Sequence, residues 1–358
     1  MKAFFTKARE WVWLEGDPDK DRSVGLAIAG ALEMGLGVLS FSLAMLLLIV
    51  VSSTGLGSMK TAHFWLSMGF LFYMTGWFIV MGLGSVKARR WAPALILVGA
   101  WVTIFFGTLA LALALYILPE ALGLLMDTGI SAGLAMGLLY FIVVALVVLQ
   151  VLFPLLAIAF YSLGGVRATC ERLDPKARWT DRVPLPLLAM GCICAFGSLS
   201  IVFGATTNYV VFLFGRVVNG AVGMVIVALI SAGYAYVGWG AFTRKKHAWW
   251  GAYALVLLTS SSMMLTFSEL EMATLYESMG YAPAQIEQFA SSRAVTPTLL
   301  TFASCVWGIM ACIYLVWTRD CFHPEKDRAV VKSYQRRKAE EEAAKPVERQ
   351  GPRMRLED

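Results

Sequence analysis

A single carboxylate, Glu33, stands inside a long apolar run of this sequence. It lies in the stretch GALEMGLGVLS, residues 30–40, among glycines and aliphatic residues. An ionisable side chain inside the hydrocarbon of a bilayer costs at least about 2.5–3.5 kcal/mol on insertion scales, so it is a functional candidate. Two kinds of chemistry suit it. A neutral carboxyl can hold helices together by hydrogen bonds, or a carboxylate can exchange a proton or a cation.

The spacing around Glu33 predicts a buried polar site. Glu33 shares one helical face with small residues three or four positions apart, namely Ala27, Gly30, Gly37, Ser40 and Ala44. Such a face lets another helix approach closely. At 1.5 Å per residue, Gln150 is expected at the depth of Glu33, and Pro154 cannot donate to the carbonyl of Gln150. We expect Gln150 and Pro154 to face Glu33, with Thr75 completing the site.

The substitution Glu33→Gln separates the two roles, and the sequence leaves both open. A structural lock should tolerate the amide, because it keeps the hydrogen bonds. A transport site that cycles protons should lose activity while the protein still folds.

A second ionisable residue, Arg216, lies in another apolar run. Its expected depth differs from that of Glu33 by roughly 20 Å, which is too far for the two side chains to pair. Arg216 can extend to the outer headgroups as an anchor. Alternatively, Arg216 and Asn219 can contact an anion on the outer side.

The apolar residues predict the elements that must position these groups. Of 358 residues, 58% are hydrophobic and 15% are charged, against about 25% charged in soluble domains. The apolar runs have the length of membrane-crossing helices and do not alternate as barrel strands do. They span residues 23–51, 63–84, 91–117, 132–162, 184–205, 208–242, 248–268 and 297–318. The sequence therefore predicts an all-α, polytopic transmembrane bundle of eight helices.

Basic residues predict the orientation of this bundle. All but three of the 30 Lys and Arg residues fall in the two terminal segments and in alternate loops. The exceptions are Lys60, Arg216 and Arg293. Because Lys and Arg are retained on the cytoplasmic side, we expect both termini to be cytoplasmic.

The predicted organisation has three parts. Residues 1–22 are expected to form a cytoplasmic, interfacial amphipathic helix, and residues 23–318 the eight-helix bundle with an outer helical loop at 269–296. Residues 319–358 are expected to form a basic cytoplasmic tail helix with a disordered end. The tail carries Lys326, Arg328, Lys332, Arg336, Arg337 and Lys338, a cluster that attracts anionic lipid.

The loop CERLDPKARWTDRVPLP, residues 170–186, resembles a cytoplasmic loop of uncharacterised bacterial multi-pass membrane proteins. The resemblance implies a bacterial cytoplasmic (inner) membrane and no particular activity.

The sequence lacks several common catalytic motifs, which favours a non-enzymatic function. The sequence has no nucleotide-binding P-loop, no H-E-x-x-H and no G-x-S-x-G. We expect no enzyme activity, cofactor, metal site or nucleic-acid partner. The leading hypothesis is transport or permeation of a small solute or ion. The alternative is a non-catalytic scaffold or accessory subunit that binds proteins or anionic lipid through its basic loops and tail. Expected partners are membrane lipids and a protein partner or a second copy.

Overall fold

The computed structural model describes residues 21–54, 61–127, 131–281 and 296–322, with positions 283, 286 and 287 between them. Within these residues, eight helices are long and apolar enough to cross a membrane. The prediction of a helical bundle with eight such helices is thus confirmed. Residues 1–20 of the predicted interfacial helix, the six tail residues from Lys326 to Lys338 and residues 288–295 of the loop 269–296 lie outside the described residues.

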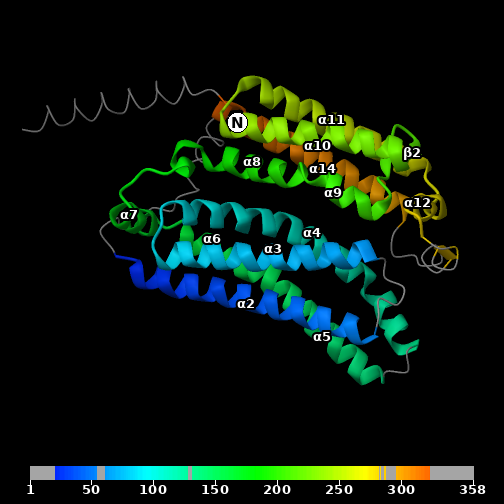
Figure 1. Ribbon diagram of the computed structural model, residues 1–358, viewed down its shortest axis with the longest axis horizontal. Coiled ribbons are helices and arrows are strands. Elements are labelled where there is room, and N and C mark those ends of the chain that lie inside the picture. The colour runs from blue at the N-terminus through cyan, green and yellow to red at the C-terminus, as the bar shows by residue number, and fades with distance from the viewer. Residues whose placement is uncertain are drawn as a thin grey trace, which may run out of the picture.

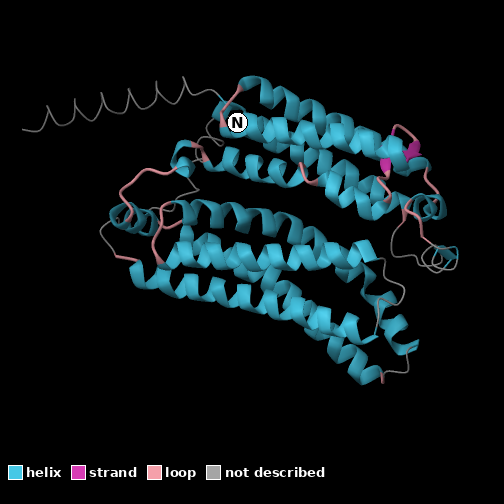
Figure 2. Ribbon diagram, in the orientation of Figure 1, coloured by secondary structure: helices cyan, strands magenta, loops and turns pink. Residues whose placement is uncertain are grey.

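The first four long segments form one half of the molecule (Figure 1). They are α2 (Ser23–Thr54), α3 (Thr61–Val86), α4 (Trp91–Asp127), and a last crossing made of α5 (Ala132–Val147), the π-helical turn η1 (Val148–Leu152) and α6 (Phe153–Tyr161). α2 packs along α3, and α4 packs against α5 and α6. Figure 2 shows helices joined by loops, and no strand, in the described part of this half.

The second half follows a short linker. The linker contains α7 (Gly164–Leu173) and the 3₁₀ turn η2 (Trp179–Arg182). The half itself comprises α8 (Leu185–Gly197), α9 (Ser200–Gly204), η3 (Ala205–Thr207), strands β1 (Val211–Leu213) and β2 (Arg216–Val218), α10 (Gly220–Phe242), α11 (Lys246–Glu269), α12 (Met272–Ser278), α14 (Pro297–Thr318) and η4 (Arg319–Phe322). α10 packs against α8, and α11 packs against α14.

The fourth crossing is interrupted next to Pro154, where proline has no N–H to donate. The N–H of Phe153 instead bonds the carbonyl of Val148, five residues earlier. This i→i+5 pattern is that of a π-bulge, which often occurs at functional sites. The helix therefore continues through the proline.

The expected crossing at 208–242 is corrected by the structure. Its first part is a β-hairpin, in which Leu213 pairs with Arg216. The two residues between them, Phe214 and Gly215, have φ of 44° and 89°, as a tight type I′ turn requires. β-branched residues on both sides favour strands, so the membrane-length helix begins only at Gly220.

Each half has its own apolar core. In the first half Leu26, Leu97 and Tyr161 are buried together, and in the second Leu187 and Trp249 belong to a separate cluster. Many large apolar side chains on the outer faces of the helices remain exposed. The bundle is therefore apolar both inside and outside.

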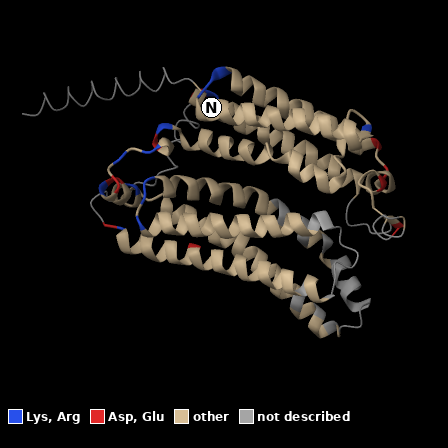
Figure 3. Cartoon of the chain, viewed as in Figure 1, with Lys and Arg blue, Asp and Glu red and all other residues tan. Residues whose placement is uncertain are grey.

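Basic residues gather at one end of the bundle, which we call the basic end. Every described Lys and Arg except Arg216 lies there, around the loops between α3 and α4, around α7 and η2, and between α10 and α11 (Figure 3). Arg216 lies at the opposite end, in the hairpin.

Candidate functional site

Glu33 is buried where three helices of the first half meet. It lies on α2 with 4% of its surface exposed. Tyr161, the last residue of α6, donates its hydroxyl to Oε1 at 2.9 Å. Ser85, in the last turn of α3, lies 3.1 Å from Oε2 and can donate to it. The carboxyl of Glu33 therefore connects α2 to both α3 and α6.

These three side chains form a closed ring, because Ser85 Oγ also lies 2.7 Å from the hydroxyl oxygen of Tyr161. Each hydroxyl has one proton, so an ionised carboxylate would leave three contacts with only two protons. A neutral carboxyl supplies the third. Glu33 then donates to Ser85, Ser85 to Tyr161 and Tyr161 to Glu33. The geometry thus fits a neutral hydrogen-bonded lock.

The structure corrects the expected partners of Glu33. Gln150 lies in η1 and packs on α4, where a Cβ added to Gly107 would lie 2.6 Å from Gln150 Oε1. Pro154 is buried in α6. Thr75 donates to the carbonyl of Leu71 on its own helix at 2.9 Å.

The depth estimate from segment centres explains this error. It assumed parallel helices of similar length, whereas α2 has 32 residues and the fourth crossing is divided into three helical pieces. Glu33 meets the last turn of α3, at Ser85, and the last residue of α6, so α2 is offset along both helices and Tyr161, rather than Gln150, lies beside Glu33.

Close backbone contact seals the α2–α3 side of Glu33. A Cβ added to Gly30 would lie 2.5 Å from the carbonyl oxygen of Gly82, and the converse distance is the same. Further along α2, a Cβ added to Gly37 would lie 3.2 Å from the carbonyl oxygen of Thr75. The small-residue face predicted from the sequence thus packs on protein, although Ala27 is exposed.

Arg216 and Asn219 also differ from their expected setting within a helix. The Arg216 side chain is exposed at the start of β2. Asn219 precedes α10 and donates its amide to the carbonyl of Ser278 at 3.2 Å. Asn219 therefore ties the hairpin to the end of α12.

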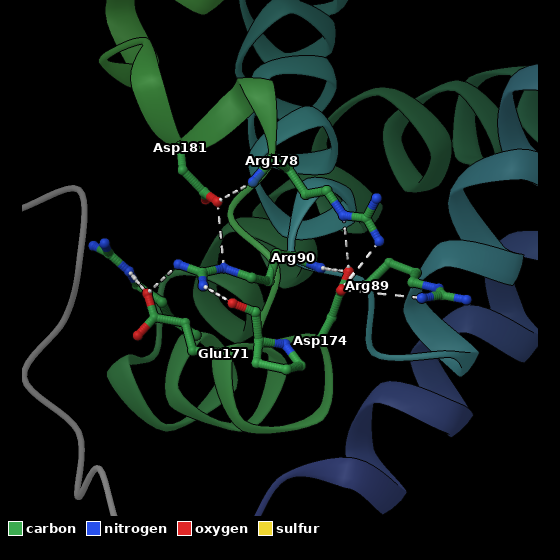
Figure 4. A network of polar contacts seen from close by, with 8 residues as sticks. Arg89, Arg90, Glu171, Asp174, Arg178 and Asp181 are labelled. Carbon is green, nitrogen blue, oxygen red and sulfur yellow. Dashed lines mark hydrogen bonds and ion pairs between the residues drawn. The ribbon is translucent and has the colours of Figure 1, made fainter.

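A second polar centre at the basic end is formed by the linker (Figure 4). Asp174 is buried and accepts two hydrogen bonds from Arg178, at 3.0 and 3.2 Å. It also accepts the backbone N–H of Arg90 at 3.4 Å. The bonds from Arg178 hold the pKa of the Asp174 carboxyl below its usual range, against the opposite effect of burial.

Arg90 joins the start of α4 to the same linker. Its guanidinium lies 3.4 Å from a carboxylate oxygen of Glu171 and 3.3 Å from one of Asp181. Arg167 shares Glu171 at 2.9 Å. These ion pairs fix the linker across the loop between α3 and α4.

The two halves meet along a contact that we call the seam. There α4 packs against α8, and the rings of Phe105 and Phe106 lie 5.9 and 5.5 Å from that of Trp307 on α14. A pocket of about 320 Å³ opens at the basic end of the seam. A second pocket, of about 420 Å³, lies nearer the other end, between residues 66–71 of α3 and Phe203 of α9. Glu33 lines neither pocket.

Sequence reasoning missed both the ring and the seam. Tyr161 and Ser85 lie at the ends of apolar runs, where a hydroxyl is common and gives no signal. The loop 170–186, by contrast, was singled out by its sequence and does form the network of Asp174 and Arg178. No family model, curated protein or solved structure matches this chain.

Proposed function

We propose that the protein is a multi-pass protein of a bacterial cytoplasmic membrane, with both termini in the cytoplasm. The exposed apolar faces support this proposal: Leu229 is 68% exposed and Phe302 is 67% exposed. Apolar surface on this scale suits lipid rather than water. The basic end takes the cytoplasmic side, where Lys and Arg are retained.

Within this membrane we propose transport or permeation of a small solute or ion along the seam. The observation that carries the proposal is a pocket near each end of the same contact between two four-helix halves. Small-molecule sites favour such interfaces. Many transporters expose a site to alternate sides by rocking one bundle against the other. The seam offers both a pocket-bearing interface and two bundles that can move against each other.

This proposal moves the transport site away from Glu33 and Gln150. Glu33 is enclosed by protein and has its hydrogen-bonding capacity used by Tyr161 and Ser85. We assign it the structural one of its two possible roles. Its hydrogen bonds hold the first half rigid. A bundle that rocks as one unit requires such rigidity.

Access to the two pockets from the two sides of the membrane tests the proposal. We call the pocket at the basic end the basic-end pocket and the second pocket the outer pocket. Single cysteines replace Ser67 in the outer pocket and Ala94 in the basic-end pocket, on a background without native cysteines. A membrane-impermeant thiol reagent should modify Ser67→Cys only from outside and Ala94→Cys only from the cytoplasmic side. A cysteine at Lys176, exposed on the linker, is the positive control. Modification of the control alone would mean a sealed seam and would refute the proposal.

Uptake into liposomes provides the functional measurement. Labelled anions, cations and neutral solutes are supplied to reconstituted protein. Ser67→Trp should block uptake, because the indole fills the outer pocket. Leu39→Trp, on an exposed face of α2, should not.

The rival function is a scaffold that binds proteins or anionic lipid through the basic end. The concentration of described Lys and Arg at this end favours it. Deletion of residues 324–358 distinguishes the two functions, because it should remove partner or lipid binding by a scaffold and leave solute uptake intact.

A further inference from the structure

The basic-end pocket has walls from both halves and from the linker. Pro93 and Ala94 at the start of α4 form one side, and Leu185 and Leu188 of α8 form another. The linker and Arg244, from the turn between α10 and α11, complete it. A volume of about 320 Å³ lies at the lower end of the range for ligand sites, so it suits a small ligand.

The pocket carries an excess of positive charge. Four arginines line it, against two carboxylates, Glu171 and Asp181. Arg90 and Arg167 already pair with these acids. Arg182 forms no hydrogen bond or ion pair within the described part of the chain. Guanidinium groups bind carboxylates and phosphates through paired N–H donors.

Arg244 is the one of these four arginines that comes from the second half. Its Nε donates to the carbonyl of Cys321 at 3.0 Å, which fixes the side chain at the pocket. Cys170 also lines the pocket. Burial, together with the nearby carboxylates of Asp174 and Glu171, raises the pKa of its thiol to about 12, so it adds no negative charge at neutral pH.

A buried donor without a partner points to a ligand. Thr180 lines the pocket and is 3% exposed, and its hydroxyl has no hydrogen-bond partner. A buried hydroxyl normally has one. A hydroxyl can donate to an oxyanion held by the neighbouring arginines, so the charge and the unpaired donor favour the same class of ligand.

We propose that this pocket binds a phosphate group, with Arg182 and Arg244 supplying charge and Thr180 donating a hydrogen bond. The phosphate belongs either to a free anion or to the headgroup of an anionic lipid, since the chemistry is shared. Because the pocket joins both halves and the linker, bound phosphate stabilises their contact at the basic end. Binding at equilibrium is measured without transport, so this proposal and the proposed function fail independently.

Inorganic phosphate is the probe for a free anion. The full chain is purified in a neutral detergent, and its unfolding midpoint is followed during phosphate titration, with sodium chloride at equal ionic strength as the reference. Phosphate should raise the midpoint and saturate. An equal shift of the unfolding midpoint with sodium chloride would overturn the proposal. So would the absence of any shift both with phosphate in detergent and with phosphatidylglycerol in nanodiscs.

Three variants locate the site. Arg182→Gln should weaken phosphate binding by about tenfold or more, as expected for lost hydrogen bonds to a charged group. Thr180→Val should also weaken binding while raising the stability of the phosphate-free protein, because it removes an unpaired buried hydroxyl. Lys176→Gln removes the same charge from an exposed residue of the linker outside the pocket and should change neither. Unaltered binding in both pocket variants would refute the site.

Lipid composition separates the two sources of phosphate. The protein is compared in nanodiscs of phosphatidylcholine with and without added phosphatidylglycerol. If the ligand is a lipid headgroup, phosphatidylglycerol should stabilise the wild type but not Arg182→Gln. It should also reduce the rise in unfolding midpoint that inorganic phosphate causes. A free-anion site should respond to phosphate equally in both lipids. Either result supports the pocket and identifies its ligand.

Discussion

Replacing Tyr161 by phenylalanine is a direct test of the ring around Glu33. The substitution removes one hydroxyl and keeps the aromatic ring, which is 1% exposed. It abolishes the 2.9 Å bond to Glu33 and the 2.7 Å contact with Ser85. Two buried polar groups then lose one partner each.

The expected loss of stability is about 1–2 kcal/mol. Leaving a buried polar group unpaired costs about 1–3 kcal/mol in soluble proteins. Hydrogen bonds between membrane helices average about 0.6 kcal/mol, with a maximum near 1.7. A loss of about 1–2 kcal/mol lowers the ratio of folded to unfolded protein by about 5- to 30-fold.

Reversible unfolding in mixed micelles with sodium dodecyl sulfate measures this difference. Tyr140→Phe is the matched control, because Tyr140 is 74% exposed in the same crossing. Glu33→Gln should cost less than Tyr161→Phe, since the amide can accept from Tyr161 and donate to Ser85 as a neutral carboxyl does. The double variant Glu33→Leu with Tyr161→Phe should show non-additive losses.

Two results would refute this reasoning. If Tyr161→Phe is no more destabilising than Tyr140→Phe, the ring does not hold the helices together. If Glu33→Gln costs as much as Tyr161→Phe, the ring binds an ionised carboxylate. In that case proton or cation exchange at Glu33 becomes the better interpretation.

Three further predictions concern packing, pH and turn geometry. Gly30→Ala should destabilise the protein by about 1–3 kcal/mol, because the added methyl group would meet the backbone of Gly82. Gly35→Ala is the control: a Cβ there has no atom within 4 Å, so this change should be neutral or stabilising in the same unfolding assay. Equal effects of the two changes would refute the contact. Asp174 has a lowered pKa in the folded protein. Its contribution to folding stability is therefore present above the pKa of about 4 in the unfolded chain and is lost as the pH falls through the folded value. Asp174→Asn should reduce stability at pH 7 by about 1.5–3 kcal/mol and flatten the acid part of a stability–pH profile. Gly215→Ala should destabilise the hairpin, because φ is 89° there and residues with a side chain rarely adopt a positive φ. Hydrogen exchange of the backbone amides of residues 211–218 should then be faster than in the wild type. Unchanged exchange would contradict the turn assignment.

The seam and the ring have complementary roles in the proposed mechanism. The ring of Glu33, Tyr161 and Ser85 connects three helices within the first half. The basic-end network instead connects the first half to the linker, through Arg90 and Asp174. A phosphate bound next to that network would therefore bias the contact between the halves without disturbing the interior of either.

The sequence by itself determined the number and type of the long elements. In lipid each backbone amide must be satisfied within its own helix, so the length of an apolar run suffices to predict a crossing. The same local logic predicted that Pro154 would leave a gap in the backbone hydrogen bonding of the fourth crossing. It failed at 211–218, where an apolar run also fits strands and the turn at Phe214 and Gly215 carried the missed signal.

Only the tertiary structure decided which polar groups meet. Glu33 was recognisable from its apolar setting, but its partners depend on helix tilt, rotation and offset, which many weak packing contacts set together. Tyr161, 128 positions away, is next to it for that reason, and Gln150 is not. The pocket at the basic end likewise needs α4, α8, the linker and Arg244 at once, so no single segment of the sequence could reveal it.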